Sequence, residues 1–203
     1  MAQSPIGMRL KSASAPTKDR LFKHAGASLE SLARIIDATT NKAQSRLRLF
    51  RWLVFNVLVG NDDAHLKNLS FFVSPEGIRL APHYDLLWTG AYHTRAIADD
   101  DARWAAVPMT FELPGGVRTF ADVTHNAILA AGEVLGIPPK PASNIVRDVV
   151  HRVEAAFAHI LQERRAFRDH APKQLAPYVA QEDRLLKVIE HITLKDMLKR
   201  LGN

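Results

Sequence analysis

Two carboxylates and an amide stand in an order that suits the handling of a magnesium-bound phosphate. Asp63 precedes Asn68 in an Asp-x-x-x-x-Asn pattern, and Asp85 follows later in the segment His-Tyr-Asp. In protein kinases, one such carboxylate orients the attacking hydroxyl, while the amide and the later carboxylate hold Mg²⁺. The neighbouring Asp62 lacks that spacing to Asn68, so we expect it to stabilise the turn. The spacing therefore favours phosphoryl transfer.

The same residue types also occur in plain turns, because Asn and Asp side chains hydrogen-bond their own backbone. The sequence context favours the chemical interpretation. The apolar run 47–59 precedes the motif, and a strand-like run, 69–73, comes after it. Ser-Pro-Glu-Gly then predicts a turn, and residues 78–80 predict a returning strand. A buried helix, a polar loop and a hairpin that ends near an acidic residue are the core layout of a kinase C-lobe.

The stretch Gly-Asn-Asp-Asp-Ala-His-Leu-Lys-Asn-Leu-Ser-Phe-Phe, followed by Leu-Ala-Pro-His-Tyr-Asp-Leu-Leu, resembles the catalytic core of the HipA family of toxin kinases. The likeness extends over about residues 22–161. It implies a mainly α fold with a small β hairpin, similar to the C-lobe of a protein kinase. It also implies an ATP-dependent serine/threonine kinase of bacterial toxin–antitoxin modules.

The resemblance carries over to individual positions of this sequence. It makes Asp63 the catalytic base, and it makes Asn68 and Asp85 the ligands of Mg²⁺. It assigns the ATP site to His65, Leu66, Lys67, Asn68, Tyr84 and Asp85. It further implies a small DNA-binding antitoxin as partner, with DNA contact through that complex. The implied acceptor is a protein, and an aminoacyl-tRNA synthetase is an example known in the family.

HipA-type kinases also have an N-terminal lobe with a phosphate-gripping loop, and this sequence contains no Gly-x-Gly pattern for such a loop. We predict a flexible segment over residues 1–21 and a single kinase-like domain over residues 22–203. We therefore expect the protein to be incomplete as a kinase without an N-lobe. Three explanations stay open: the sequence is a truncated gene product, a separate polypeptide supplies the N-lobe, or the protein is a remnant with another role. Two other functions stay open: a non-catalytic antitoxin- or DNA-binding module or remnant, and a small-molecule or lipid phosphotransferase.

Composition sets wider bounds. At 203 residues, with 47% hydrophobic and 24% charged residues, the protein fits one ordinary soluble domain. The absence of cysteine excludes disulfides and Cys-ligated zinc, and it agrees with a cytoplasmic location. No signal peptide is recognisable, and the apolar run 52–60 is far shorter than the roughly 20 residues that span a bilayer. The net charge of +6 permits a nucleic acid or acidic partner but identifies neither.

Helical periodicity predicts the remaining elements. Helices are expected over residues 28–37 with Ser28 as N-cap, 42–60, 120–135, 143–168 with Ser143 as N-cap, and 181–201. The helix over 42–60 is apolar nearly all round in its second half, which predicts burial and a rigid base for the loop with Asp63. Residues 92–116 show little periodicity and are expected to be irregular.

Overall fold

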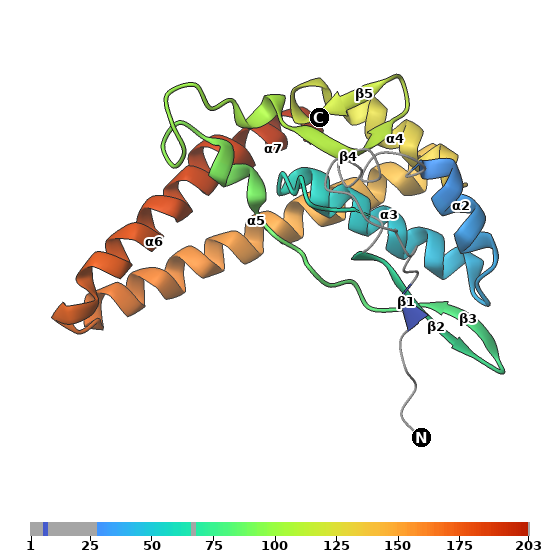
Figure 1. Cartoon of the computed structure of the whole chain (residues 1–203), viewed down its shortest axis with the longest axis horizontal. Helices are drawn as coiled ribbons and strands as arrows, with labels where there is room; N and C mark the ends of the chain where they lie inside the picture. The colour runs from blue at the N-terminus through green and yellow to red at the C-terminus, as the bar shows by residue number, and fades with distance from the viewer. Residues whose placement is uncertain (1–5, 8–27, 66–67, 203) are drawn as a thin grey trace, which may run out of the picture.

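The computed structural model describes residues 6–7, 28–65 and 68–202, and these ranges are mainly helical. The α-helices are α2 (Leu29–Asp37), α3 (Lys42–Leu58), α4 (His125–Val134), α5 (Pro139–His170), α6 (Ala176–Val188) and α7 (Lys195–Leu201). The strands are β1 (Ile6–Gly7), β2 (Ser70–Ser74), β3 (Gly77–Leu80), β4 (Pro108–Leu113) and β5 (Val117–Thr119). Most helices surround α3, and the C-terminal part of α5 extends away to one side together with α6 (Figure 1). The prediction of a mainly α protein is confirmed.

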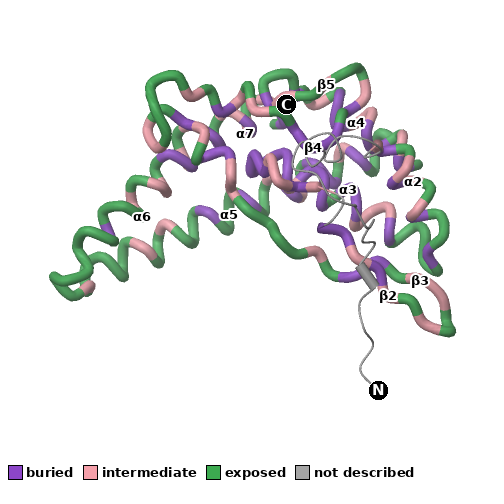
Figure 2. The backbone as a smooth tube through the Cα atoms, viewed as in Figure 1, coloured by how far each residue is buried: buried purple, intermediate pink, exposed green. Residues whose placement is uncertain are grey.

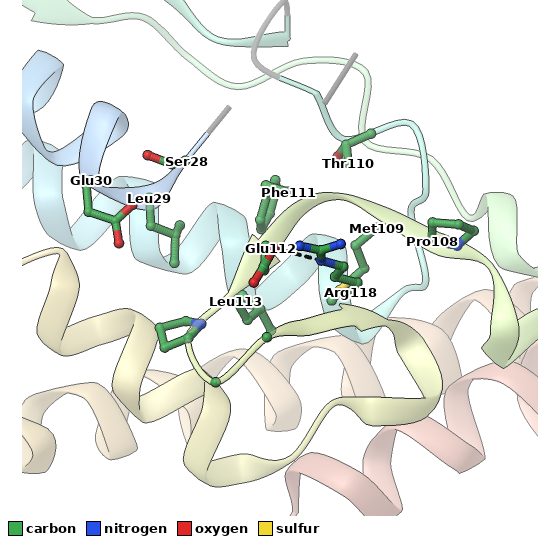
Figure 3. Close-up of a pocket in the computed structure, with 13 residues that line it drawn as sticks. Ser28, Leu29, Glu30, Pro108, Met109, Thr110, Phe111, Glu112, Leu113 and Arg118 are labelled. Carbon is green, nitrogen blue, oxygen red and sulfur yellow. Dashed lines mark hydrogen bonds and ion pairs between the residues drawn. The ribbon is translucent and has the colours of Figure 1, made fainter. Parts of the chain in front are cut away.

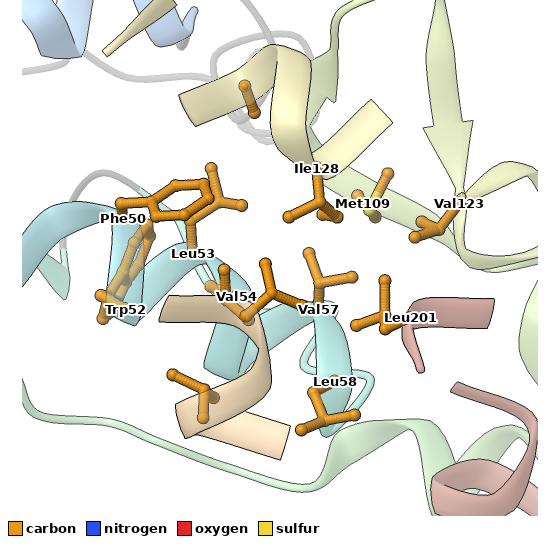
Figure 4. Packing of buried hydrophobic residues seen from close by; sticks show 14 of the residues in the cluster. Phe50, Trp52, Leu53, Val54, Val57, Leu58, Met109, Val123, Ile128 and Leu201 are labelled. Atoms are coloured by element: carbon orange, nitrogen blue, oxygen red, sulfur yellow. The ribbon is translucent and has the colours of Figure 1, made fainter. Parts of the chain in front are cut away.

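Helix α3 forms the centre of the hydrophobic core. It contacts α2, α4, α5 and α7. Its buried apolar residues lie on nearly all sides: Leu49, Phe50, Trp52, Leu53, Val54, Val57 and Leu58. Ile128, Met109 and Leu201 pack around them from other elements (Figure 4). Packing of this kind is strong, since truncating one fully buried leucine to alanine costs about 2–5 kcal/mol of stability. Helix α3 is therefore a rigid base for the loop at its C-terminal end.

Strands β2 and β3 form the predicted hairpin. Phe71 lies opposite Leu80, and Ser74 lies opposite Gly77, whose φ of 116° suits glycine in the turn. The Arg48 side chain of α3 donates to the backbone carbonyl oxygens of Leu80 and Ala81, each at 2.9 Å. The end of the hairpin is therefore attached to α3. Strand β1 pairs with β2 as a short third strand.

A second hairpin corrects the expectation that residues 92–116 are irregular throughout. Strands β4 and β5 pair antiparallel across a turn that contains Gly115 and Gly116, both at positive φ. The strand was hidden because Met109, Thr110 and Phe111 are buried in succession, so the sequence does not alternate between polar and apolar residues. Short 3₁₀ turns cover Thr89–His93 and Trp104–Ala106 of the same region.

Several helix ends differ from the prediction. Ser143 is not an N-cap, because α5 begins at Pro139, where proline is tolerated in the first turn. Helix α4 begins after Thr124, which caps it, rather than at residue 120. Helix α6 begins at Ala176 rather than at 181, and a π-helical segment, Ile189–Leu194, joins it to α7.

Other expectations have different outcomes. Ser28 caps α2 as predicted, in a reciprocal pair with Ser31. Apart from β1, the predicted flexible segment 1–21 lies outside the described residues, and the domain division stays a prediction. In the ranges that the structure describes, no helix is long and apolar enough to cross a membrane.

Candidate active site

The loop with Asp63 starts at the C-terminus of α3, where two backbone hydrogen bonds fix its direction. The N–H of Gly60 donates to the C=O of Val57 at 3.1 Å, and the N–H of Asn61 donates to the C=O of Asn56 at 2.8 Å. This pair of bonds is a common helix ending that places glycine in the left-handed region, and Gly60 has a φ of 65°. The loop is thus anchored to the most buried helix of the molecule.

Two buried amides hold the first residues of the loop. Asn61 Nδ2 donates to Asn56 Oδ1 at 2.7 Å, and Asn56 Nδ2 donates to the C=O of Trp52 at 2.8 Å. Asn61 Oδ1 accepts the N–H of Asp63 at 3.1 Å. The two amides are only 2% and 3% exposed. Breaking one of these bonds would leave a buried polar group unpaired, which costs about 1–3 kcal/mol.

Asp63 and Asn68 meet through the backbone of the loop. Asn68 Nδ2 donates to the C=O of Asp63 at 3.0 Å, and the same oxygen accepts the N–H of His65 at 2.8 Å. The N–H of Asn68 donates to the C=O of His65 at 2.9 Å. The Asn68 side chain is buried, whereas the Asp63 side chain is 43% exposed. The loop therefore folds back on itself with Asp63 accessible from solvent.

Asp85 joins the loop through its backbone. Asn61 Nδ2 donates to the C=O of Asp85 at 3.3 Å. Asp85 has a φ of 58°, in the left-handed region that few residues other than Gly, Asn and Asp adopt. Such backbone conformations cost free energy and cluster at functional sites. The structure thus connects the segment of the late carboxylate to the segment of Asp63.

Asp62 contacts residues of the 3₁₀ turn Thr89–His93 rather than the residues that Asp63 contacts. Its N–H donates to Thr89 Oγ1 at 2.9 Å, and its carboxylate lies 3.2 Å from His93 Nε2. The Thr89 hydroxyl donates to the C=O of Gly60 at 3.1 Å. Asp62 therefore attaches the loop to the 3₁₀ turn Thr89–His93. This agrees with the expectation that Asp62 stabilises the loop, and the assignment of Asp63 as the catalytic base stays a prediction.

The other predicted site residues flank this loop. His65 Nε2 lies 3.7 Å from Asp63 Oδ1. The Tyr84 hydroxyl lies 3.1 Å from Ser70 Oγ, which links the residue before Asp85 to strand β2. Leu66 and Lys67 lie outside the described residues, so their assignment to the nucleotide site stays a prediction.

His83 lies two positions before Asp85 and is an unusual histidine. Both ring nitrogens are buried and lack a hydrogen-bond partner in the described part of the protein, and the ring packs near Trp52. Burial lowers the pKa of His83, and the Arg48 guanidinium lowers it further. The neutral imidazole is therefore favoured, which suits a packing role beside α3.

The donor atoms of the loop fit Mg²⁺ better than a transition metal. Among the described residues, no three His, Cys, Asp or Glu side chains gather as they would around zinc. Asn68 Nδ2 is used by Asp63, which leaves Asn68 Oδ1 as the acceptor for a cation. Mg²⁺ usually takes one or two carboxylates, with water and phosphate oxygens completing its shell. Asn68 Oδ1 and the Asp85 carboxylate match this chemistry.

A hollow of about 600 Å³ lies elsewhere, between the start of α2 and the β4–β5 hairpin (Figure 3). Leu29, Phe111 and the Glu112–Arg118 ion pair are among the groups that line it. None of the predicted site residues that the structure describes lines this hollow. It is linked to the loop by Thr110, whose hydroxyl donates to the C=O of Ala64 at 2.6 Å. The candidate site is therefore the loop at residues 60–68, not the hollow.

Comparison with known proteins identifies the family. The HipA-like C-terminal domain family matches residues 8–157. The chain belongs to this family. It is 26% identical over 137 residues to the serine/threonine-protein kinase toxin HipA of Shewanella oneidensis. It is also 50% identical over 46 residues to the putative kinase Y4mE of Sinorhizobium fredii. The resemblance to the HipA family, which was inferred from the motif, is confirmed as family membership.

The fold is similar to that of HipA in the solved complex of Shewanella oneidensis HipA with HipB and operator DNA. The TM-score is 0.60 at 21% identity, and the match covers 94% of this protein and 41% of that one. The sequence matches cover 67% and 23% of this protein, but only 29% and 11% of the HipA and Y4mE proteins. The HipA-like domain thus corresponds to less than half of the relatives it matches.

Sequence reasoning missed the residues that connect the site. Asn56 and Asn61 were not predicted to matter, and neither was Thr89. One signal was present: Asn56 is a polar residue inside the apolar run of α3, and buried polar groups need partners. The identity of those partners, above all the C=O of Asp85, is not encoded in any local pattern.

Proposed function

We propose that this protein provides the catalytic lobe of a HipA-like serine/threonine protein kinase, which transfers phosphate from ATP to a protein hydroxyl. One observation carries the proposal: the segments of Asp63, Asn68 and Asp85 form a single hydrogen-bonded unit. Membership of the HipA-like C-terminal domain family supports it. The similarity to a relative named as a serine/threonine-protein kinase toxin supports the choice of acceptor chemistry.

In the proposed reaction, Asp63 orients the acceptor hydroxyl and takes its proton. The hydroxyl oxygen forms a bond to the γ-phosphorus of ATP as the bond from that phosphorus to the β–γ bridging oxygen breaks, and ADP leaves with the electron pair. A protein hydroxyl must reach the base from solvent, and the half-exposed Asp63 carboxylate permits this. Phosphoryl transfer of this kind depends mainly on positioning and electrostatics.

Asn68 Oδ1 and the Asp85 carboxylate would hold Mg²⁺, which neutralises charge on the phosphates when bound. The Asn68 side chain is held before any ligand arrives by the C=O of Asp63, and the backbone of Asp85 is held by Asn61. His65 and Tyr84 would line the nucleotide beside them. Leu66 and Lys67 belong to the same proposal by sequence position.

The first test of this proposal is Mg²⁺-ATP binding measured by calorimetry on the wild type and Asp85→Asn. Asparagine tolerates the same left-handed φ, so the substitution removes the charge without adding backbone strain. We expect affinity to fall at least about tenfold, or ~1.4 kcal/mol. Asp101→Asn removes one negative charge from an exposed cluster and is the matched control, with unchanged affinity. Equal affinities for wild type and Asp85→Asn would remove Asp85 as a ligand.

The second test separates the base from the metal site. Asp63→Asn should retain Mg²⁺-ATP affinity while phosphate incorporation into protein falls below detection, because the amide cannot accept the hydroxyl proton. Phosphate transfer that survives this change would remove Asp63 as the base.

We also propose, from the relative solved with HipB and operator DNA, that the protein works with a small DNA-binding antitoxin. A cytoplasmic location follows for an enzyme that uses ATP and a DNA-bound partner, and an aminoacyl-tRNA synthetase is the first acceptor to assay. Co-purification with the product of an adjacent helix-turn-helix reading frame tests the partnership. Separate elution of the two proteins at micromolar concentration would count against it.

A further inference from the structure

We infer that Asn61 is a positioning residue that sets the loop of Asp63 in register with the segment of Asp85. It acts through their backbones and does not touch substrate. Its catalytic importance rests on the proposed function, whereas its role in joining the two segments can be tested without any activity.

The side-chain amide of Asn61 is fully used by the fold. Its two N–H groups serve Asn56 Oδ1 and the C=O of Asp85, and its Oδ1 accepts the N–H of Asp63. The backbone N–H of Asn61 donates to the C=O of Asn56. Because Asn61 is buried, water does not replace these bonds when they break. Movement of either segment relative to the other therefore leaves a buried group unpaired.

Asn61 is attached to the hydrophobic core through Asn56. Asn56 lies in α3 and is itself fixed by the C=O of Trp52. Helix α3 thus fixes the position of Asn56, and Asn56 fixes the position of Asn61. Asn61 in turn fixes the positions of both segments. Thr89 also holds the loop, but its backbone partners are Gly60 and Asp62 rather than Asp85. Within the described ranges, Asn61 is the side chain whose hydrogen bonds join the backbones of Asp63 and Asp85.

An amide is the group that this position requires, because it donates and accepts at once. Asn61→Asp keeps an acceptor for the N–H of Asp63 but removes both donors, including the one to Asp85. Asn61→Leu removes donors and acceptor together. The two substitutions therefore distinguish the link to Asp85 from the link to Asp63.

Hydrogen exchange on the 203-residue protein tests the link directly. In Asn61→Asp, the amide of Gly90, which donates to the C=O of Gly60, should exchange at least about tenfold faster than in wild type, compared at equal global stability, because the segment after Asp85 opens locally. Asn61→Leu should add faster exchange at 61–65. Thr39→Val is the matched control, since Thr39 is equally buried and bonded to Ile36 and Ser45 away from the loop. The same exchange profile in Asn61→Asp and Thr39→Val would overturn the inference.

A measurement on the wild type keeps the inference testable if the variants do not fold. The side-chain amide protons of Asn61 should exchange slowly in an NMR experiment, together with the N–H of Asp63. Exchange of the side-chain protons at the rate of a free amide would overturn the inference.

The catalytic consequence is tested by kinetics. Turnover of Asn61→Asp should fall about a hundredfold, as for a misplaced reacting group, while Thr39→Val keeps the wild-type value. Excess Mg²⁺ should restore part of the loss in Asn61→Asp but none in Asp63→Asn. Wild-type turnover in Asn61→Asp would overturn the catalytic role. A wild type that fails to bind Mg²⁺-ATP both alone and together with a polypeptide that supplies an N-lobe would defeat the proposed function, and the exchange experiment would still decide whether Asn61 joins the two segments.

Discussion

The loop around Asn61 and the hairpin of α5 and α6 use polar side chains in opposite ways. At the loop, Asn56, Asn61 and Asn68 are buried and hydrogen-bonded to one another or to the backbone. On the hairpin, charged side chains such as Arg164 and Asp183 pair across two helices. The outer turns of both helices are largely exposed, whereas α3 is largely buried (Figure 2).

This difference indicates that the geometry of the side chains is more tightly fixed at the loop than on the hairpin of α5 and α6. A buried neutral amide is stabilising only when its hydrogen bonds are made with good geometry, so it fixes direction as well as distance. An exposed ion pair tolerates many geometries and contributes little, because water and salt screen it. We therefore expect substitutions at the loop to have larger and more cooperative effects than substitutions on the hairpin.

The largest effect on stability should come from Asn56→Leu. The substitution leaves Asn61 Nδ2 without its nearest acceptor in a place that water does not reach. We expect a loss of about 2–3 kcal/mol in the free energy of unfolding, measured by urea denaturation. Thr39→Val, which also removes buried hydrogen bonds, to Ile36 and Ser45, but affects no link between distant segments, should lose only about 1 kcal/mol. Equal losses for the two variants would break the distinction drawn for the loop.

The second largest effect should come from Gly90→Ala, because the loop and the 3₁₀ turn after Asp85 approach closely there. An added Cβ would lie 3.0 Å from the carbonyl oxygen of Gly60 and 3.3 Å from Trp104 Cε3. Overpacking of this kind costs about 1–3 kcal/mol, and relief by backbone movement would displace Asp62 and its neighbours. Thermal unfolding and Mg²⁺-ATP titration should both detect the change.

Gly116→Ala is the control for that substitution. Gly116 has a φ of 78° in the β4–β5 turn, where an added Cβ comes no closer than 3.9 Å to Glu112. Only backbone strain of about 1 kcal/mol is expected, with unchanged Mg²⁺-ATP affinity. A similar loss of affinity in both variants would show that the close packing at Gly90 has no special importance for the site.

What could be predicted of this fold depended on local signals. Ser28 capped α2 as expected, and Ser-Pro-Glu-Gly placed the β2–β3 turn, since caps and turns are determined by neighbouring residues. Strand β4 and the start of α5 were missed. Buried Met109–Phe111 do not alternate, and Pro139 begins a helix without a side-chain cap.

For the candidate site, spacing alone selected Asp63, Asn68 and Asp85, and their roles stay predictions. Spacing did not reveal the link between them, because the contact of Asn61 with Asp85 joins residues far apart in the sequence. Its geometry depends on how the β2–β3 hairpin returns to α3. Long-range polar contacts of this kind result from packing, so they become visible only in the folded protein.

On the hairpin of α5 and α6, we expect the largest loss of stability from a substitution of Arg164. It is 15% exposed, pairs with Glu182 at 2.6 Å and Asp183 at 3.1 Å, and donates to the C=O of Val179. Arg164→Leu should cost about 1 kcal/mol, because Glu182 is itself exposed and the aliphatic stem is replaced. Hydrogen exchange should increase in α6 but remain unchanged at residues 60–65. The exposed neighbour Arg165 provides the control, and faster exchange at the loop in Arg164→Leu would show that hairpin and loop are coupled.

The smallest effect should come from Arg152→Ala on α5. Arg152 pairs with Asp148 at 2.8 Å one helical turn away, but the two side chains are 77% and 38% exposed. Such a pair contributes about 0.3–0.5 kcal/mol, and the higher helix propensity of alanine offsets part of it. Urea denaturation should detect almost no change at low salt and none in about 1 M NaCl, where the screening length is about 3 Å. A loss above about 1 kcal/mol that persists in high salt would mean that a surface charge on α5 is held as firmly as the buried amides, and the contrast between the two regions would no longer hold.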